Sequence, residues 1–144
     1  MPLSASLIEI REYTGTGYAP LVDYGAWRVA ILRFIDELLP EKITSVQRHD
    51  ETDEVFILLE GKCILFLGEP GQDGLTAIHA VDMQPLKLYN VKRGSWHTHT
   101  LDKAAVVLIV ENCDTVDANS PVMDLTPAQR QEIVSLTQSL WVRV

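Results

Sequence analysis

Cysteine is scarce in this sequence. Cys63 and Cys113 are the only two, and they form no CxxC pair, so a disulfide framework is not predicted. Cys63 lies in an apolar stretch, where a reduced thiol usually behaves as a small buried hydrophobic side chain. Reduced thiols are typical of the cytosol, and the N-terminal segment lacks the basic start and long apolar region of a signal peptide. We therefore expect a cytoplasmic protein.

Long apolar runs and positive charge are also lacking. No run approaches the roughly 20 apolar residues needed to span a bilayer. The 12 lysines and arginines are outnumbered by 20 acidic residues, and the net charge of −8 argues against nucleic acid or an anionic membrane surface as a partner. Hydrophobic residues make up 47% of the chain, a normal globular level. We expect residues 1–144 to form one domain.

Most of the sequence is typical of β-strands separated by turns. The expected strands, rich in β-branched and aromatic residues, cover residues 26–35, 43–49, 54–60, 63–68, 75–81, 86–91 and 104–112. Strands this frequent, joined by short links, favour an all-β sandwich or barrel with a core at about residues 26–112. Residues 13–20 contain glycine but no phosphate-binding pattern, and we expect them to be a flexible N-terminal segment.

The C-terminal segment has the signals of a helix. Thr126 is suited to cap it, Pro127 to occupy its first position, and Gln129 to complete the capping box. The apolar side chains that fall on or beside one helical face are Ile133, Val134, Leu136, Leu140 and Trp141. A helix at about residues 127–141 is therefore predicted to pack against the barrel.

The expected strand at residues 54–60 is apolar at successive positions. A strand with one wet face would not need both Val55 and Phe56. We expect one face to line the barrel interior and the other to be covered by a second sheet, the C-terminal helix or a partner subunit. The sequence thus predicts a homodimer.

Histidines and acidic residues are grouped in two segments. His97 and His99 are two residues apart, so in a strand they project from the same face. His49 and Glu54 flank a short acidic stretch, and a turn there would bring them onto adjacent strands. Two imidazoles and one carboxylate suit Fe(II), Mn(II), Ni(II), Co(II) or Zn(II). The alternative reading is a solvated turn or a polar pocket that binds no metal.

These segments resemble the two motifs of the cupin family. In the first motif, G-x5-H-x-H-x3,4-E-x6-G, His49 matches the second histidine, Glu54 the glutamate and Gly61 the closing glycine. In the second, G-x5-P-x-G-x2-H-x3-N, Gly94 and His97 match. The resemblance implies an all-β, cupin-like double-stranded β-helix barrel of the jelly-roll type. It also implies a divalent metal held by the motif histidines and glutamate.

The sequence departs from these motifs in several places. Gln47 stands where the family has its first histidine, which leaves three family ligands, and either His99 or the amide of Gln47 could complete the set. The remaining departures affect the opening glycines, the proline and the asparagine, where Glu41, Leu86, Lys92 and Leu101 stand instead.

Two functions are compatible with this sequence. The first is a metal-dependent enzyme acting on a small polar metabolite by dioxygenase, isomerase or lyase chemistry, with the metal as Lewis acid or oxygen activator. The second is a non-catalytic module that binds a small molecule with a weak metal or none. If their strand face points inward, Arg33 could bind a substrate carboxylate and Trp27 could wall the pocket.

Overall fold

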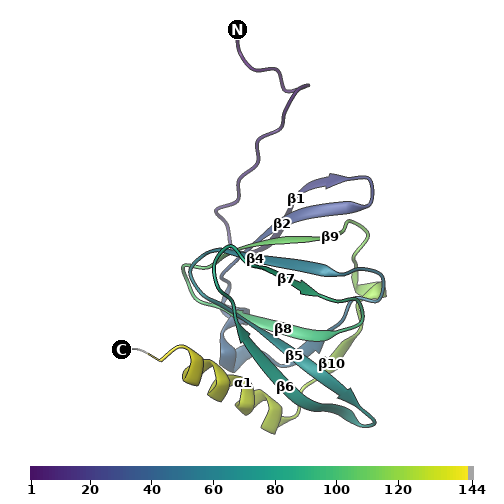
Figure 1. Ribbon diagram of the computed structural model, residues 1–144, viewed down its shortest axis with the longest axis vertical. Coiled ribbons are helices and arrows are strands. Elements are labelled where there is room, and N and C mark those ends of the chain that lie inside the picture. Colours follow the sequence, from purple (N-terminus) through teal and green to yellow (C-terminus); the bar gives the residue numbers. More distant parts are fainter. Residues whose placement is uncertain (143–144) are drawn as a thin grey trace.

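The computed structural model describes residues 1–142, which form two five-stranded antiparallel sheets that face each other (Figure 1). Sheet I has the order β1 (Gly17–Tyr24), β2 (Trp27–Arg33), β9 (Val106–Asn112), β4 (Glu54–Glu60) and β7 (Leu88–Val91). Sheet II has the order β10 (Val122–Asp124), β3 (Ser45–Gln47), β8 (Trp96–Leu101), β5 (Cys63–Gly71) and β6 (Gly74–Asp82). From β3 onward the chain crosses repeatedly between the sheets, which is the topology of a double-stranded β-helix barrel. The fold class expected from the sequence is confirmed.

Four helical segments complete the described residues 1–142. Three are single 3₁₀ turns, η1 (Asp36–Leu38), η2 (Pro40–Lys42) and η3 (Asp117–Asn119), and the fourth is α1 (Pro127–Leu140). No helix within residues 1–142 is long and apolar enough to cross a membrane.

The core follows from the alternation of side chains along the strands. In β4, Phe56 and Leu58 point between the sheets and are buried, whereas Val55 and Ile57 point outward and are half-buried. Phe56 and Leu58 belong to a cluster with the inward side chains of β2, β5 and β9. The apolar side chains of β4 therefore alternate between the barrel interior and the outer face of sheet I.

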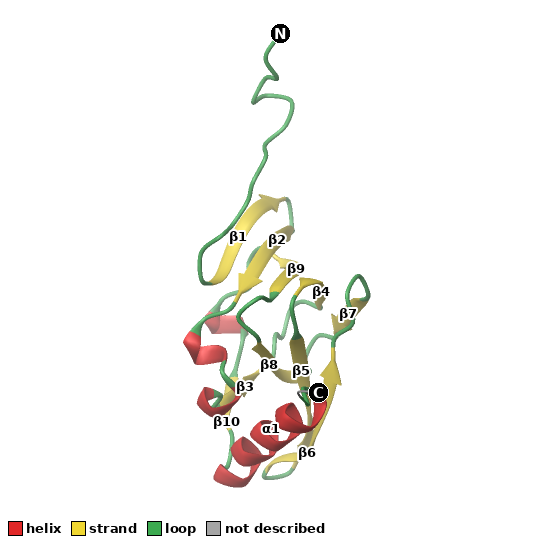
Figure 2. Ribbon diagram, turned by 90° about the vertical axis from the view of Figure 1, so that its left-hand side faces the viewer, coloured by secondary structure: helices red, strands yellow, loops and turns green. Residues whose placement is uncertain are grey.

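A second core lies between sheet II and α1, which packs against that sheet (Figure 2). Thr126 and Gln129 form the expected capping box, and Ile133 is fully buried among the apolar side chains of sheet II. The expected burial of Leu140 was wrong. It is 41% exposed at the last helical residue, and Thr137 occupies the buried position one turn earlier.

The motif glycines have a conformational role. Gly61 joins β4 to β5 with φ at +72°, and a Cβ atom there would lie 2.5 Å from the backbone nitrogen of Ala105. Leu86 stands where the second cupin motif has its opening glycine, and it is the one non-glycine residue among residues 1–142 with positive φ, at 67°. The turn conformation is therefore kept although the glycine is lost, and a side chain there carries a steric cost.

The N-terminal strand was not foreseen from the sequence, and neither was the short strand β10. Residues 13–20 were expected to be flexible, yet β1 begins at Gly17 and pairs with β2 along its whole length. Tyr18 and Leu32 are cross-strand partners on the inner face. As a result β1 brings Tyr18, which is 40% exposed, to the inner face of sheet I.

Candidate metal centre

His49, Glu54 and His97 meet inside the barrel. Each of the three offers a donor atom, and these atoms all lie within 4.8 Å of one another. Oε1 of Glu54 is 3.1 Å from Nε2 of His97 and 3.5 Å from Nε2 of His49. All three residues are buried. The structure thus brings together the three residues that match the family motifs.

The backbone explains why the two motifs converge. Glu54 opens β4 in sheet I, whereas His97 lies on β8 in sheet II. The backbone nitrogen of Gly94 donates a 2.8 Å hydrogen bond to the carbonyl of His49, and Gly94 has φ at +80°. This bond ties the loop after β3 to the turn before β8. The glycine of the second motif therefore fixes the position of the histidine from the first.

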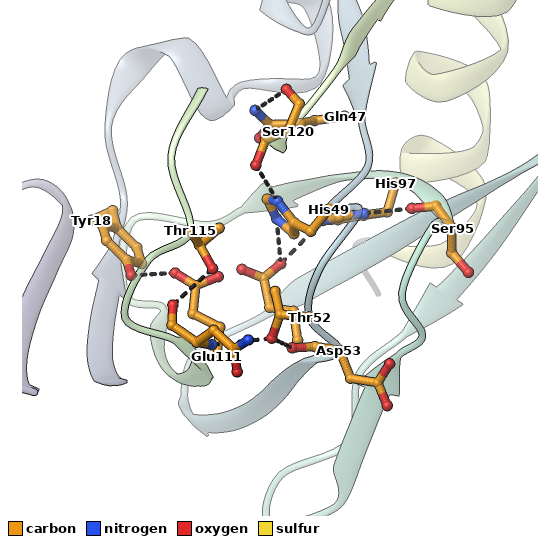
Figure 3. Close-up of polar contacts among 12 residues, drawn as sticks. Tyr18, Gln47, His49, Thr52, Asp53, Ser95, His97, Glu111, Thr115 and Ser120 are labelled. Atoms are coloured by element: carbon orange, nitrogen blue, oxygen red, sulfur yellow. Dashed lines mark hydrogen bonds and ion pairs between the residues drawn. The ribbon is translucent and has the colours of Figure 1, made fainter. Parts of the chain in front are cut away.

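Neighbouring groups orient both imidazole rings (Figure 3). Nδ1 of His49 lies 2.8 Å from Oγ of Ser120, and Nδ1 of His97 lies 2.9 Å from the carbonyl of Ser95. With each Nδ1 engaged, each Nε2 is directed at the carboxylate of Glu54. Hydrogen bonds to the second ring nitrogen orient metal-binding histidines in this way.

The electrostatics of the cluster favour an ionised carboxylate. Burial alone would raise the pKa of Glu54, but the hydrogen bonds with His49 and His97 outweigh it and hold that pKa well below its usual range. A charged carboxylate between two imidazole nitrogens is a donor set that suits a divalent transition metal. The residues present therefore fit the metal that the cupin resemblance implies.

Glu111 and Tyr18 also belong to the site, although sequence reasoning did not single them out. The hydroxyl of Tyr18 donates a 2.5 Å hydrogen bond to Oε1 of Glu111, while Oε2 of Glu111 is buried with no hydrogen-bond partner among the described residues. Burial, together with the adjacent carboxylate of Glu54, raises the pKa of Glu111 to about 8. The pocket therefore holds two carboxyl groups whose pKa values are shifted in opposite directions, that of Glu54 downward and that of Glu111 upward.

The two candidates for a fourth ligand lie at the edge of the cluster. Gln47 is the cross-strand partner of His97, and its side-chain nitrogen donates a 3.2 Å hydrogen bond to the carbonyl of Ser120. His99 has its ring 5.8 Å from that of Phe56, its Nδ1 is buried without a partner, and burial lowers its pKa to about 4. Neither residue belongs to the set of donor atoms formed by His49, Glu54 and His97.

Replacing Gln47 by histidine is expected to tighten the binding of Zn(II) or Ni(II) by on the order of tenfold, because imidazole is the stronger ligand for these ions. Cross-strand partners have Cβ atoms about 5 Å apart, so the new ring would lie beside that of His97. Isothermal titration of Gln47→His against the parent measures the change. Gln47→Asn is the matched control, since it keeps an amide and should not tighten binding. Equal affinities would show that a side chain at position 47 does not reach the cluster.

Arg33 and Trp27 lie elsewhere. In β2 the inward positions are Ala30 and Leu32, so residues 27 and 33 lie on the outer face of sheet I. Nε of Arg33 donates a 2.7 Å hydrogen bond to the carbonyl of Tyr13, and Trp27 is exposed at the end of the strand. The substrate-binding roles expected of Arg33 and Trp27 required side chains that point into the barrel. These two side chains point outward instead.

A pocket of about 320 Å³ opens onto the cluster. Three of its lining residues are acidic, namely Glu54, Glu111 and Asp117. The remaining lining residues are Tyr18, Leu32, Gln47, His49, His97, His99, Ile109, Thr115, Val116 and Ser120. Within residues 1–142, no lysine or arginine lines this pocket.

Comparison with known proteins gives structural matches alone. No protein-family model and no curated protein matches the sequence. The solved structure of Streptomyces PAC13 with uridine aligns at a TM-score of 0.55 and 9% identity, over 83% of this chain and 87% of that one. Another structure of Pac13 is described as that of a nucleoside dehydratase.

Two further structures also align. KdgF from Halomonas sp. matches at a TM-score of 0.50 and 9% identity, over 70% of this chain and 81% of that one. A cupin-2 domain containing protein from Shewanella frigidimarina matches at a TM-score of 0.48 and 16% identity, over 75% and 87%. At these identities the likeness concerns the fold alone. Together with the topology of the two sheets, the likeness to PAC13 and KdgF supports the double-stranded β-helix barrel that was expected from the sequence.

Proposed function

We propose that this protein is an enzyme that binds one divalent transition metal at His49, Glu54 and His97 and acts on a small polar metabolite in the adjoining pocket. The observation that carries the proposal is the convergence of two Nε2 atoms on one buried carboxylate, with each Nδ1 held by a separate partner. When bound, the metal would supply Lewis-acid chemistry, which polarises an oxygen of the ligand.

The residues around the cluster suit a ligand that has hydroxyl groups and no negative charge. The pocket offers the acidic side chains of Glu54, Glu111 and Asp117 and no lysine or arginine among the described residues. An anionic ligand would therefore meet like charges without a basic partner. The two positive charges of a metal ion would be offset by the charges of Glu54 and Asp117.

Glu111 would take part in binding this ligand. Tyr18 holds its Oε1, and the raised pKa of Glu111 favours its protonated form, which donates a hydrogen bond as well as accepting one. A ligand hydroxyl could use either property. We infer that Tyr18 orients Glu111 in the pocket and that Glu111 in turn orients the substrate.

The experiment compares ligands that differ by one charged group. Uridine is a suitable first probe because it is uncharged and because it occupies the structurally similar PAC13. Glucose is a second uncharged probe. Each is paired with its monophosphate, and the thermal shift and affinity of the metal-loaded protein are measured. We expect each monophosphate to bind on the order of tenfold or more weakly than its uncharged parent. In Asp117→Asn, the difference in affinity between the two ligands of a pair should be smaller. Tighter binding of both phosphates would contradict the proposal.

A binding module without metal is the second candidate, and one observation favours it. The cluster satisfies its own hydrogen bonds through Ser95 and Ser120, so the polar groups are paired without an ion. Two results together would favour this binding module over the enzyme. Ligand affinity would be unchanged after a chelator removes the metal, and the protein would show no catalytic turnover of the ligand.

A further inference from the structure

The outer face of sheet I carries two apolar rows that run across all five strands. Residues paired across neighbouring strands lie on the same face. The cross-strand pairs give a first row of Ala19, Ile31, Leu108, Ile57 and Leu88, and a second row of Val22, Val29, Val110, Val55 and Asn90. Nine of these ten positions are apolar, and none carries a charge. We call this surface the apolar face.

The two sheets differ in what covers them. Helix α1 packs on the outer side of sheet II, where Ile133 is buried. Within residues 1–142, no helix packs on the apolar face of sheet I, and Figure 2 shows α1 on the side of the barrel formed by β5 and β6. Leu88 at one edge of the apolar face is 71% exposed. Apolar side chains would not be selected at successive rows of a face that stays in water.

A second apolar feature precedes β1. Residues 1–12 are all exposed and extend away from the barrel (Figures 1 and 2), and we call them the arm. The arm carries five large apolar side chains that are at least half exposed, namely Met1, Leu3, Leu7, Ile8 and Ile10. It is attached at its base, where Arg33 donates a hydrogen bond to the carbonyl of Tyr13. The arm therefore starts beside β1, the edge strand of sheet I, and sheet I is the sheet that carries the apolar face.

We propose that two copies of this chain associate through sheet I, with the arm of each copy lying across the apolar face of the other. Five strands about 4.8 Å apart make a face roughly 20 Å wide, and its two rows cover about 300 Å². A 12-residue arm reaches up to about 40 Å and adds about 400 Å². Together they approach the roughly 800 Å² per partner of a stable interface, which neither reaches alone.

The chemistry of the two surfaces favours a second copy over a partner of another kind. The apolar face has no charged position to select an acidic or basic partner. The three charged residues of the arm are Glu9, Arg11 and Glu12, and Arg11 pairs with Glu9 at 3.2 Å. Both unpartnered features belong to the same chain, so a twofold arrangement covers the face and the arm of both copies at once.

The test is the oligomeric state of the full chain by sedimentation velocity at micromolar concentration. We expect the parent to be a dimer. Ile10→Glu in the arm and Leu88→Glu on the apolar face should each raise the dimer dissociation constant by at least about 100-fold, because each would bury an unpaired charge. Both residues are exposed in a single copy, so neither variant should lose its fold. Leu140→Glu, on α1 behind sheet II, is the matched control and should remain dimeric.

Hydrogen exchange of the arm distinguishes an arm that binds a second copy from an arm that folds onto its own barrel. We expect the backbone amides of residues 3–12 to be protected in the dimer and to lose that protection on dilution. A monomeric parent would overturn the proposal, as would a dimer that survives both substitutions. Protection that does not change with concentration would show that the arm folds onto its own barrel, which also overturns it.

Discussion

Replacing Glu54 by glutamine is expected to abolish divalent metal binding, with an increase of at least about 100-fold in the dissociation constant for Zn(II) or Ni(II). Glu54 supplies the only charge among the three donor groups, and its Oε1 lies between the two Nε2 atoms. A neutral amide of the same shape keeps the packing but removes the anionic ligand, and transition-metal sites depend on such ligands being deprotonated. Isothermal titration of apo protein measures the loss.

The matched control for Glu54 is the other carboxyl group of the pocket. Glu111→Gln should retain metal affinity within about tenfold, because Glu111 is a neighbour of the cluster and not one of its donors. His49→Ala and His97→Ala should behave like Glu54→Gln, whereas His99→Ala should lose about 10–100-fold. If Glu54→Gln bound metal as the parent does, the acidic stretch before β4 would have no role in a metal centre.

Phe56→Ala is expected to lower the free energy of unfolding by about 3–5 kcal/mol. Phe56 is 0% exposed and belongs to the cluster between the sheets. Its ring also packs 6.2 Å from that of His97 and 5.8 Å from that of His99, measured between centroids. The substitution leaves a cavity in the core and removes the ring that packs against His97 and His99.

Urea denaturation of Phe56→Ala measures this loss, with Leu140→Ala as the control. Leu140 is 41% exposed on α1, and its truncation should cost less than about 0.5 kcal/mol. The same small loss for Phe56→Ala would mean that the side chains between the sheets are not close-packed around this ring.

The fold and the convergence of His49, Glu54 and His97 could be predicted because their signals in the sequence are local. Gly94 and His97 are separated by a fixed spacing, and the hydrogen bond from Gly94 to His49 shows why that spacing is needed. The helix cap formed by Thr126 and Gln129 also lies within one turn. In each case the residues that identify the structure are also those that contact one another.

The parts that were missed depend on pairings between distant segments. Tyr18 lies 93 residues before its partner Glu111, and no local pattern in a glycine-containing segment indicates that contact. Glu111 lies near the end of the expected strand at residues 104–112 and was not singled out there. It does share the inward alternation of Val107 and Ile109, and this was the one signal that could have placed it in the pocket.

The same alternation accounts for Arg33 and Trp27. Their even separation correctly places them on one face of β2, but a strand that is apolar at most positions does not reveal which face is the inner one. The buried positions, Ala30 and Leu32, decide that question, and they do so only once β2 is paired with β1 and β9. Register across strands, and not composition, determines which side chains enter the pocket.

The most direct test of the metal centre is anomalous X-ray scattering from crystals of the metal-loaded protein. The account predicts one ion, bonded at about 2.0–2.2 Å by Nε2 of His49, Nε2 of His97 and the carboxylate of Glu54. An ion held by other residues, or no ion in crystals of a protein saturated with Zn(II), Ni(II), Co(II), Mn(II) or Fe(II) in turn, would contradict it.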